Sequence, residues 1–169
     1  TDSVVALGAN QIDNLSSDSI AALTTDQVAV IEAADVSLLN SEQLSALDSE
    51  QVGALNSDQA QALGSAQIAA LNTEQLNSLE TDSLASLSTT QLRAISSDNF
   101  AALTSENIAA LTSDQASGIR ASQFSALNTD QIGAFTTTEI DSLLTNRTSA
   151  LASLNSEQLN ALETDNLSA

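Results

Sequence analysis

The side chains of this sequence that could take part in chemistry are carboxylates, amides and hydroxyls. The 169 residues include 22 Asp and Glu but only 3 Lys and Arg, and neither His nor Cys is present. The chain therefore lacks imidazole and thiolate metal ligands, Ser–His and Cys–His nucleophile pairs, and a redox centre. Any chemistry would depend on carboxylates, acting as acid–base groups or as ligands of a hard cation such as Ca²⁺.

These carboxylates follow an eight-residue period. Fourteen of the 22 acids occupy the third position of an eight-residue unit: Asp2, Asp18, Asp26, Glu42, Glu50, Asp58, Glu74, Asp82, Asp98, Glu106, Asp114, Asp130, Glu157 and Asp165. If the units stack in register, these acids form an acidic ridge. Calcium, however, requires roughly six to eight oxygens that converge on one point, and each unit supplies one carboxylate without a glycine-containing calcium loop. We expect these acids to favour solubility and to compensate the helix dipole. Binding of Ca²⁺ by the acids is the weaker alternative, and we expect no other cofactor.

Two series of apolar residues define the unit, and the second series lies three residues after the first. The first series runs from Val4 to Ile140 and the second from Leu7 to Leu143, each at a spacing of eight and without a slip. This strict spacing indicates a tandem array of structurally equivalent octads.

The register shifts once. The first series resumes at Leu151 rather than at 148, so three extra residues lie within 144–150. The apolar spacing of three and four across this stretch is typical of a longer helix, which indicates a joint or a bend. We therefore divide the chain into a regular octad array at 1–143, an irregular stretch at 144–150 and resumed octads at 151–169.

The octad is incompatible with one continuous α-helix, because eight residues at about 100° each rotate the apolar stripe by about 80°. Instead, each unit opens with Asn, Thr, Ser or Asp and usually carries Gln three residues later, which is the spacing of a capping box. The pattern predicts one short, self-capped helix per octad. The capping glutamines, which could also stack their amides in a ladder along the array, include Gln27, Gln43, Gln51, Gln59, Gln75, Gln115 and Gln131.

Isolated helices of this length are marginal in water, so the units must stack their apolar faces into one core. We predict an all-α fold, a solenoid (superhelix) of very short capped helices with one helix per eight-residue repeat. A β-solenoid is disfavoured because Ala, Gln, Glu and Asp are poor strand formers and an apolar spacing of three breaks strand alternation. The predicted core includes Leu23, Val28, Leu39, Leu44, Leu47, Val52, Leu55, Ile68, Leu71, Phe100, Leu103, Ile108, Phe124, Ile132 and Phe135.

Composition disfavours several functions. A formal net charge of −19 opposes binding to nucleic acid and to anionic membranes. The apolar runs are far shorter than the roughly 20 residues that span a bilayer, so we expect no membrane insertion. Paired acids such as Asp130 and Glu139 occur, but repetition gives every unit the same chemistry and singles out no site. We therefore expect that the chain is not an enzyme.

Hydroxyl pairs and the first residue of the sequence are two further features. Thr and Ser pairs such as Thr24–Thr25 could form an ice-matching hydroxyl array, but Asn, Asp, Gly and Glu interrupt these positions. The sequence opens at Thr1 without Met or a signal peptide, which favours a processed product or an excised segment.

The unit resembles a known repeat. Residues Ala22–Val28 (ALTTDQV) and Ala110–Ala116 (ALTSDQA) resemble the "ALTTxQIAAL" arrays of large secreted or surface-attached bacterial repeat proteins. The resemblance covers nearly the whole chain, carries no catalytic residues across, and implies an extracellular or cell-surface, adhesin-like or filament-forming protein. The leading hypothesis is a non-catalytic structural segment, a stalk or filament subunit, that self-associates end to end or within a longer array. The alternative is a binding or adhesion module that uses the acidic repeat face, linked to Ca²⁺.

Overall fold

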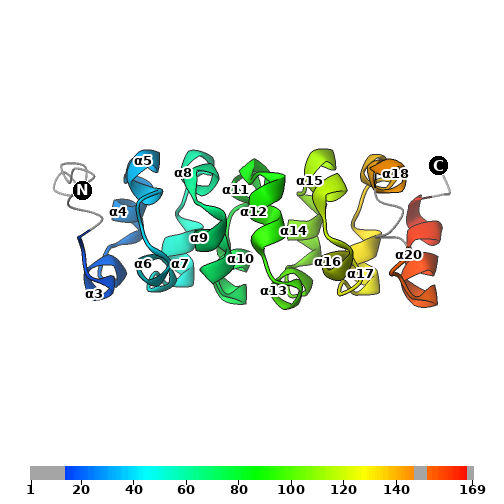
Figure 1. Cartoon of the computed structure of the whole chain (residues 1–169), viewed down its shortest axis with the longest axis horizontal. Helices are drawn as coiled ribbons and strands as arrows, with labels where there is room; N and C mark the ends of the chain where they lie inside the picture. Colours follow the sequence, from blue (N-terminus) through cyan, green and yellow to red (C-terminus); the bar gives the residue numbers. More distant parts are fainter. Residues whose placement is uncertain (1–13, 147–151, 167–169) are drawn as a thin grey trace. The chain divides into compact units, whose positions relative to one another are not determined.

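The computed structural model of the chain describes residues 14–146 and 152–166, in which all regular structure is helical (Figure 1). The chain divides after Leu87 into two compact units, residues 1–87 and 88–169. The described helices of unit 1 are α3 (Ser17–Ala21), α4 (Thr25–Ala29), α5 (Ala33–Val36), α6 (Ser41–Ser45), α7 (Ser49–Gly53), α8 (Ser57–Ala62), α9 (Ser65–Ala70), α10 (Thr73–Ser78) and α11 (Thr81–Ser86). Those of unit 2 are α12 (Thr89–Ala94), α13 (Ser97–Ala101), α14 (Ser105–Ala109), α15 (Ser113–Gly118), α16 (Ala121–Phe124), α17 (Thr129–Gly133), α18 (Thr137–Asn146) and α20 (Ser156–Asn166).

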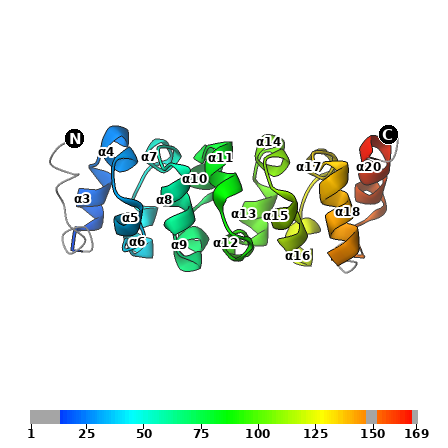
Figure 2. The ribbon, with the colours of Figure 1, turned by 90° about the horizontal axis from the view of Figure 1, so that it is seen from above.

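From α3 to α17, each octad forms one helix, as the sequence predicts. Position one of the octad is the N-cap, positions two to six form the body of the helix, and position eight ends the unit, as Asn72 to Leu79 illustrate around α10. No strand occurs in residues 14–146 or 152–166, which excludes the β-solenoid there. The view from above shows the same succession of short helices joined by very short connections (Figure 2).

The chain breaks between helices without help from glycine. Between α9 and α10, Leu71 (φ −67°, ψ 136°) and Asn72 (φ −83°, ψ 174°) are both extended. No described residue has a positive φ. Extended backbone is available to any L-residue, so a large residue at position eight and a polar cap at position one are sufficient to redirect the chain.

Each helix packs on the helix three octads away. In unit 1, α3, α6 and α9 form one row, α4, α7 and α10 a second, and α5, α8 and α11 a third. In unit 2, the rows are α12, α15 and α18; α13 and α16; and α14, α17 and α20. Within each unit, one superhelical turn therefore contains three octads, or 24 residues. The number of octads per turn is a quantity that the sequence alone leaves open.

The two apolar series form the core of each unit. All the predicted core residues are buried except Leu23, which is only partly buried. Leu23 lies in the first described turn, where described residues stack on one side only. In unit 2, the rings of Phe124 and Phe135 lie 5.5 Å apart at 53°, in the range of favourable tilted aromatic contacts.

Consecutive turns approach closely where glycine replaces a larger residue. A Cβ atom on Gly118 of α15 would lie 2.8 Å from Cγ2 and 2.9 Å from Cβ of Thr89 in α12. In unit 1, a Cβ on Gly53 of α7 would lie 2.9 Å from the backbone oxygen of Ser78. Small residues at these positions therefore permit the observed spacing between turns.

The octad pattern changes after Leu143. Helix α18 extends for 10 residues and passes the position where a new octad would begin, because Leu144 there has no side-chain oxygen to cap a new helix. Helix α18 is thus longer than the helices before it, and residues 152–153 form a turn. The rest of the predicted irregular stretch, 147–150, lies outside the described residues. Helix α20 is 11 residues long and likewise passes the next octad start at Glu163.

Candidate functional site

The glutamine at position four joins backbone groups in two different turns. In α8, Oε1 of Gln59 accepts the backbone N–H of Asn56 at 2.9 Å, and Oδ1 of Asn56 accepts the N–H of Gln59 at 3.0 Å. Nε2 of Gln59 donates to the carbonyl oxygens of Ile31 at 2.7 Å and Val28 at 2.9 Å. One side chain, 1% exposed, thus satisfies the start of its own helix and carbonyls at the end of the octad that contains α4.

The same arrangement recurs through both units. The side-chain amides that reach a carbonyl 28 residues earlier are Gln43 to Leu15, Gln51 to Leu23, Gln59 to Ile31, Gln67 to Leu39 and Gln75 to Leu47 in unit 1, and Gln123 to Ile95 and Gln131 to Leu103 in unit 2. The acceptor is a backbone carbonyl rather than the amide of the neighbouring glutamine, so these residues act as the predicted capping residues and do not form the amide ladder that was the alternative. Gln27 and Gln115 form capping boxes with Thr24 and Thr112.

The sequence contained a signal for this second bond. A capping box accepts Glu as readily as Gln at its fourth position, and the chain is rich in acids. Yet this position is Gln in twelve octads and Glu only at Glu139. Only the amide has a donor for the preceding turn, so the selection of Gln over Glu indicates that a donor is required.

The three-residue insertion preserves the turn-to-turn bond. In α20, Nε2 of Gln158 donates to the carbonyl oxygens of Leu127 at 2.7 Å and Ser125 at 3.1 Å. The separation from Leu127 is 31 residues, three more than the regular 28. Unit 2 therefore absorbs the insertion within one turn and restores the register of the side-chain bonds.

Among the described octads, those of α3, α5, α11 and α18 have no amide side chain at position four. In α11, Oγ of Ser83 donates to the carbonyl of Leu55 at 2.9 Å, but Glu80 at the N-cap makes no side-chain capping bond. In α18, Oε2 of Glu139 accepts the N–H of Thr136 at 2.7 Å. The carboxylate of Glu139 caps its own helix but has no amide donor for the preceding turn.

Arg120 stands where other octads have a polar cap. Its backbone N–H donates to Oε1 of Gln123 at 3.0 Å, and its Nη2 donates to the carbonyl of Ile95 at 2.8 Å. Nε of Arg120 is buried without a hydrogen-bond partner. Arg120 therefore adds a turn-to-turn bond but loses the side-chain cap of α16. Gly64 similarly leaves α9 without a side-chain cap.

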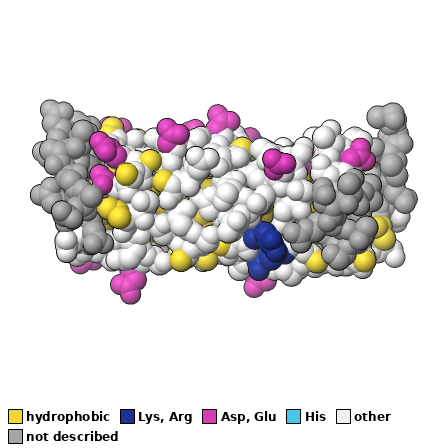
Figure 3. All heavy atoms as spheres, turned by 45° about the horizontal axis from the view of Figure 1, so that its top comes forward, with side chains coloured by type: hydrophobic (Ala, Val, Ile, Leu, Met, Phe, Trp, Pro, Cys, Tyr) yellow, Lys and Arg dark blue, Asp and Glu magenta, His cyan; other side chains and the backbone are white. Residues whose placement is uncertain are grey.

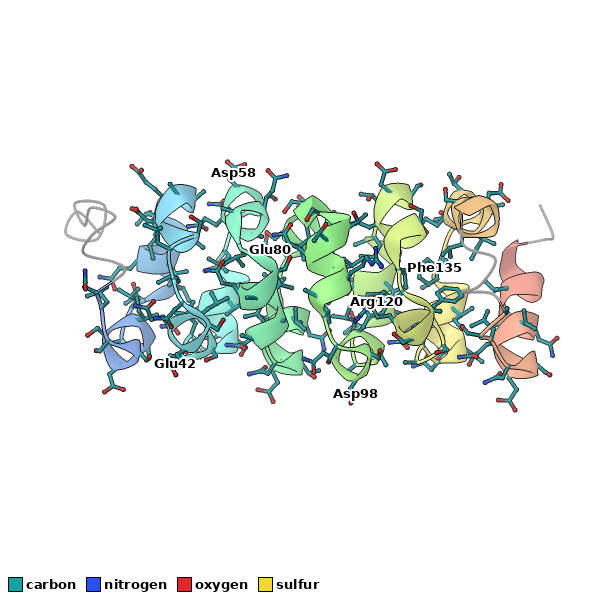
Figure 4. The ribbon with its side chains drawn as sticks, viewed as in Figure 1. Glu42, Asp58, Glu80, Asp98, Arg120 and Phe135 are labelled. Atoms are coloured by element: carbon teal, nitrogen blue, oxygen red, sulfur yellow. The ribbon has the colours of Figure 1, made fainter. Side chains whose placement is uncertain are left out.

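The acids at position three all point to solvent. Each of the twelve described members, from Asp18 to Glu157, is exposed, and Glu42, Asp58 and Asp98 project from the outer edges of the ribbon (Figure 4). Because every third helix stacks, the acids of each unit follow three rows rather than one ridge. Figure 3 shows the acids of one face scattered and a single group of arginine atoms.

These carboxylates do not converge in the part of the chain that the structure describes. No group of three acidic side chains there is arranged to hold a metal ion. The two acids that the sequence offered as a pair differ in environment: Asp130 is exposed, whereas Glu139 is buried and bonded to Thr136.

The repeated short helices, the three-octad turn and the turn-to-turn glutamines define a helical solenoid repeat protein. More specifically, residues 28–65 and 76–113 each match the ALTTAQ repeat, which confirms the resemblance of the unit to ALTTAQ-type octapeptides in these segments. No curated protein matches the chain. Among the described residues, no helix is long and apolar enough to cross a bilayer.

Proposed function

We propose that the chain is a non-catalytic structural segment of an extracellular or cell-surface bacterial protein, acting as a stalk or filament subunit. The observation that supports this best is the use of position four. Its amide recurs in twelve octads and, as at Gln59 and Gln131, lies inside the solenoid and bonds one turn to the next. The repeated chemistry therefore serves cohesion between turns rather than a ligand.

The composition of the outer surface agrees with this role. The exposed positions carry mostly Ser, Thr, Asn, Ala and single acids, and the described part holds no convergent carboxylate group. Interfaces of high affinity are enriched in Tyr, Trp and Arg, whereas the chain has no Tyr or Trp and three basic residues. We accordingly propose that neither nucleic acid nor a cofactor is a partner and that the chain carries no enzymatic activity.

Surface labelling of the source cells tests this proposal. An antibody against the segment should decorate intact cells, and brief protease treatment of those cells should remove the epitope while a cytoplasmic marker persists. Detection of the segment only after lysis would contradict an extracellular role.

The exposed acids favour one alternative, a binding or adhesion module that uses the acidic faces. In unit 1, the row α4, α7 and α10 carries Asp26, Glu50 and Glu74, all exposed. Calorimetric titration with Ca²⁺ separates the two functions. Micromolar binding, lost when Glu50 is replaced by Gln, would favour the module, whereas the structural role predicts no binding in that range.

A further inference from the structure

Glu139 of α18 is a buried carboxylate at the position where twelve other octads carry glutamine. It is 5% exposed. Its Oε2 accepts the backbone N–H of Thr136 at 2.7 Å, as Oε1 of Gln131, one octad earlier, accepts the N–H of Asn128 at 2.8 Å. The capping oxygen therefore has the same place in both helices. Because a carboxylate and an amide have the same planar shape, Oε1 of Glu139 takes the place that Nε2 has in Gln131.

The group that Glu139 faces in the preceding turn is a carbonyl oxygen. Nε2 of Gln131 donates to the carbonyl of Leu103, 28 residues earlier, and the same separation leads from Glu139 to Leu111. The octads between Leu111 and Glu139 keep the regular spacing, because the three-residue insertion follows Leu143. Leu111, like Leu103, is buried at position eight. Two acceptors, a carboxylate oxygen and a carbonyl oxygen, thus meet where Gln131 supplies a donor.

The charged groups around Glu139 do not supply the missing donor. The described helices that precede α18 or pack on it carry Glu106 in α14, Asp114 in α15 and Asp130 in α17, and α18 itself carries Asp141. All four are exposed acids, so none of them brings a positive charge or a donor to the buried carboxyl group. Within the described residues, Oε2 of Glu139 has a hydrogen-bond donor and Oε1 has none.

We propose that Glu139 is a pH-sensitive contact between turns: on acidification its carboxyl group gains a proton, and the resulting O–H donates to the carbonyl oxygen of Leu111. A protonated carboxyl group has one O–H donor and keeps an acceptor oxygen, so it reproduces both functions of the glutamine amide. The proton comes from solvent, and no bond between heavy atoms changes. The folded chain then binds a proton in a hydrogen bond that the unfolded chain lacks, so a fall in pH stabilises unit 2 at this contact.

Protonation completes the series of turn-to-turn bonds in this part of unit 2. The octads of α16, α17 and α20 make these bonds through Gln123, Gln131 and Gln158, and Glu139 interrupts the series at α18. The inference goes beyond the proposed structural function, because it makes the cohesion of unit 2 respond to the pH of its surroundings. Surface labelling of cells does not involve Glu139, so the two proposals fail separately.

Urea unfolding of the full chain at about pH 7 and at about pH 4.5, a range in which glutamate side chains take up protons, tests this contact. The lower value stays above the isoelectric point of about 4.1, so the chain keeps a negative charge. Glu139→Gln carries the donor at every pH. Its urea midpoint should exceed that of the unmodified chain at neutral pH, and the difference should shrink as the pH falls.

Glu106→Gln is the matched control, because it removes the same charge from an exposed position in the first turn of α14. A carboxylate is favourable at that place in a helix, so this variant should have a midpoint equal to or below that of the unmodified chain at neutral pH. The sign of its effect is therefore opposite to that of Glu139→Gln. If Glu106→Gln showed the same gain with the same pH dependence, the effect would be one of net charge and the proposal would be wrong.

The neighbouring octad allows the same contact to be introduced elsewhere. Gln131→Glu places a carboxyl group opposite the carbonyl of Leu103, so the stability that it loses at neutral pH, compared with the unmodified chain, should be partly recovered at the lower pH. Because Gln131→Glu and Glu139→Gln alter different octads, one comparison remains if the other variant does not fold. A Glu139→Gln difference that is constant with pH, or a Gln131→Glu deficit that acidification leaves unchanged, would overturn the proposal.

Discussion

Replacing Gln131 by Glu would test the role of the turn-to-turn amide with the smallest available change. Gln131 is 2% exposed, and its Oε1 accepts the N–H of Asn128 at 2.8 Å. Its Nε2 donates to the carbonyls of Leu103 at 2.6 Å and Ala101 at 2.8 Å. Glutamate has the same shape and retains the capping oxygen, so only the donor is lost.

The expected loss of stability follows from these contacts. A buried hydrogen bond contributes about 1 kcal/mol net, and a buried polar group left without a partner costs about 1–3 kcal/mol. Gln131→Glu removes two donated bonds and places a carboxylate oxygen against two carbonyl oxygens. We expect unit 2 to lose about 3 kcal/mol of unfolding free energy.

Urea unfolding followed by circular dichroism measures this loss as a lower midpoint with an unchanged slope. Hydrogen exchange measures the effect at single amides. The glutamate can still accept the backbone N–H of Asn128, so this amide should stay as protected from exchange, compared with the other amides of α17, as it is in the unmodified chain. Gln61→Glu, the same change at an exposed position whose amide donates to the carbonyl of Ser86 at 3.5 Å, is the control for added charge and for loss of a long, solvated bond, and should alter stability by less than about 0.5 kcal/mol. If Gln131→Glu were as mild as Gln61→Glu, the glutamines would be capping residues only.

The converse change, Glu139→Gln, should raise the urea midpoint of unit 2 by the equivalent of about 1 kcal/mol, because the new amide can donate to the carbonyl of Leu111, 28 residues earlier; a midpoint that stays constant or falls would contradict this. Gly118→Ala should lower the melting temperature, at a cost of about 1–3 kcal/mol, because its Cβ would lie 2.8 Å from Cγ2 of Thr89; an unchanged melting temperature would show that the turns can separate without penalty. Gly64→Asn should raise the stability of unit 1 in urea unfolding by up to about 1 kcal/mol, since it adds the missing cap of α9 and reduces the freedom of the unfolded chain. The nearest contact of a Cβ at Gly64 is Oε1 of Gln67 at 3.2 Å, the end of a flexible side chain, so a loss of stability would argue against the capping account.

The sequence predicted the helices because their determinants are local. A cap at position one, a glutamine at position four and apolar residues at positions five and eight all lie within one octad, as in Asn40 to Leu47. The same locality explains the longer helix α18, where Leu144 supplies no cap. Helix type and helix start could therefore be derived without knowledge of the neighbouring turn.

The three-octad turn could not be derived in this way. The angle between successive helices depends on the dihedral angles of two extended residues, such as Leu71 and Asn72. Extended backbone spans a broad range of φ and ψ, so small differences there change the number of helices per turn. The partner of Gln59 at Ile31, 28 residues away, follows only once that number is known.

The burial of position four explains why most acids, fourteen of the 22, lie at position three instead. Position four is enclosed between turns, where a carboxylate lacks the donor that the preceding carbonyls require. Position three, one residue earlier in the first turn of the helix, is exposed and close to the free N–H groups, so a carboxylate is favourable there. An octad can thus carry one acid without weakening the bond between turns, and Glu42 beside Gln43 shows both positions in adjacent residues. Repetition of this pair of residues places the twelve described acids of position three on the exposed surface, while the side chains that bond one turn to the next at the glutamine positions remain neutral.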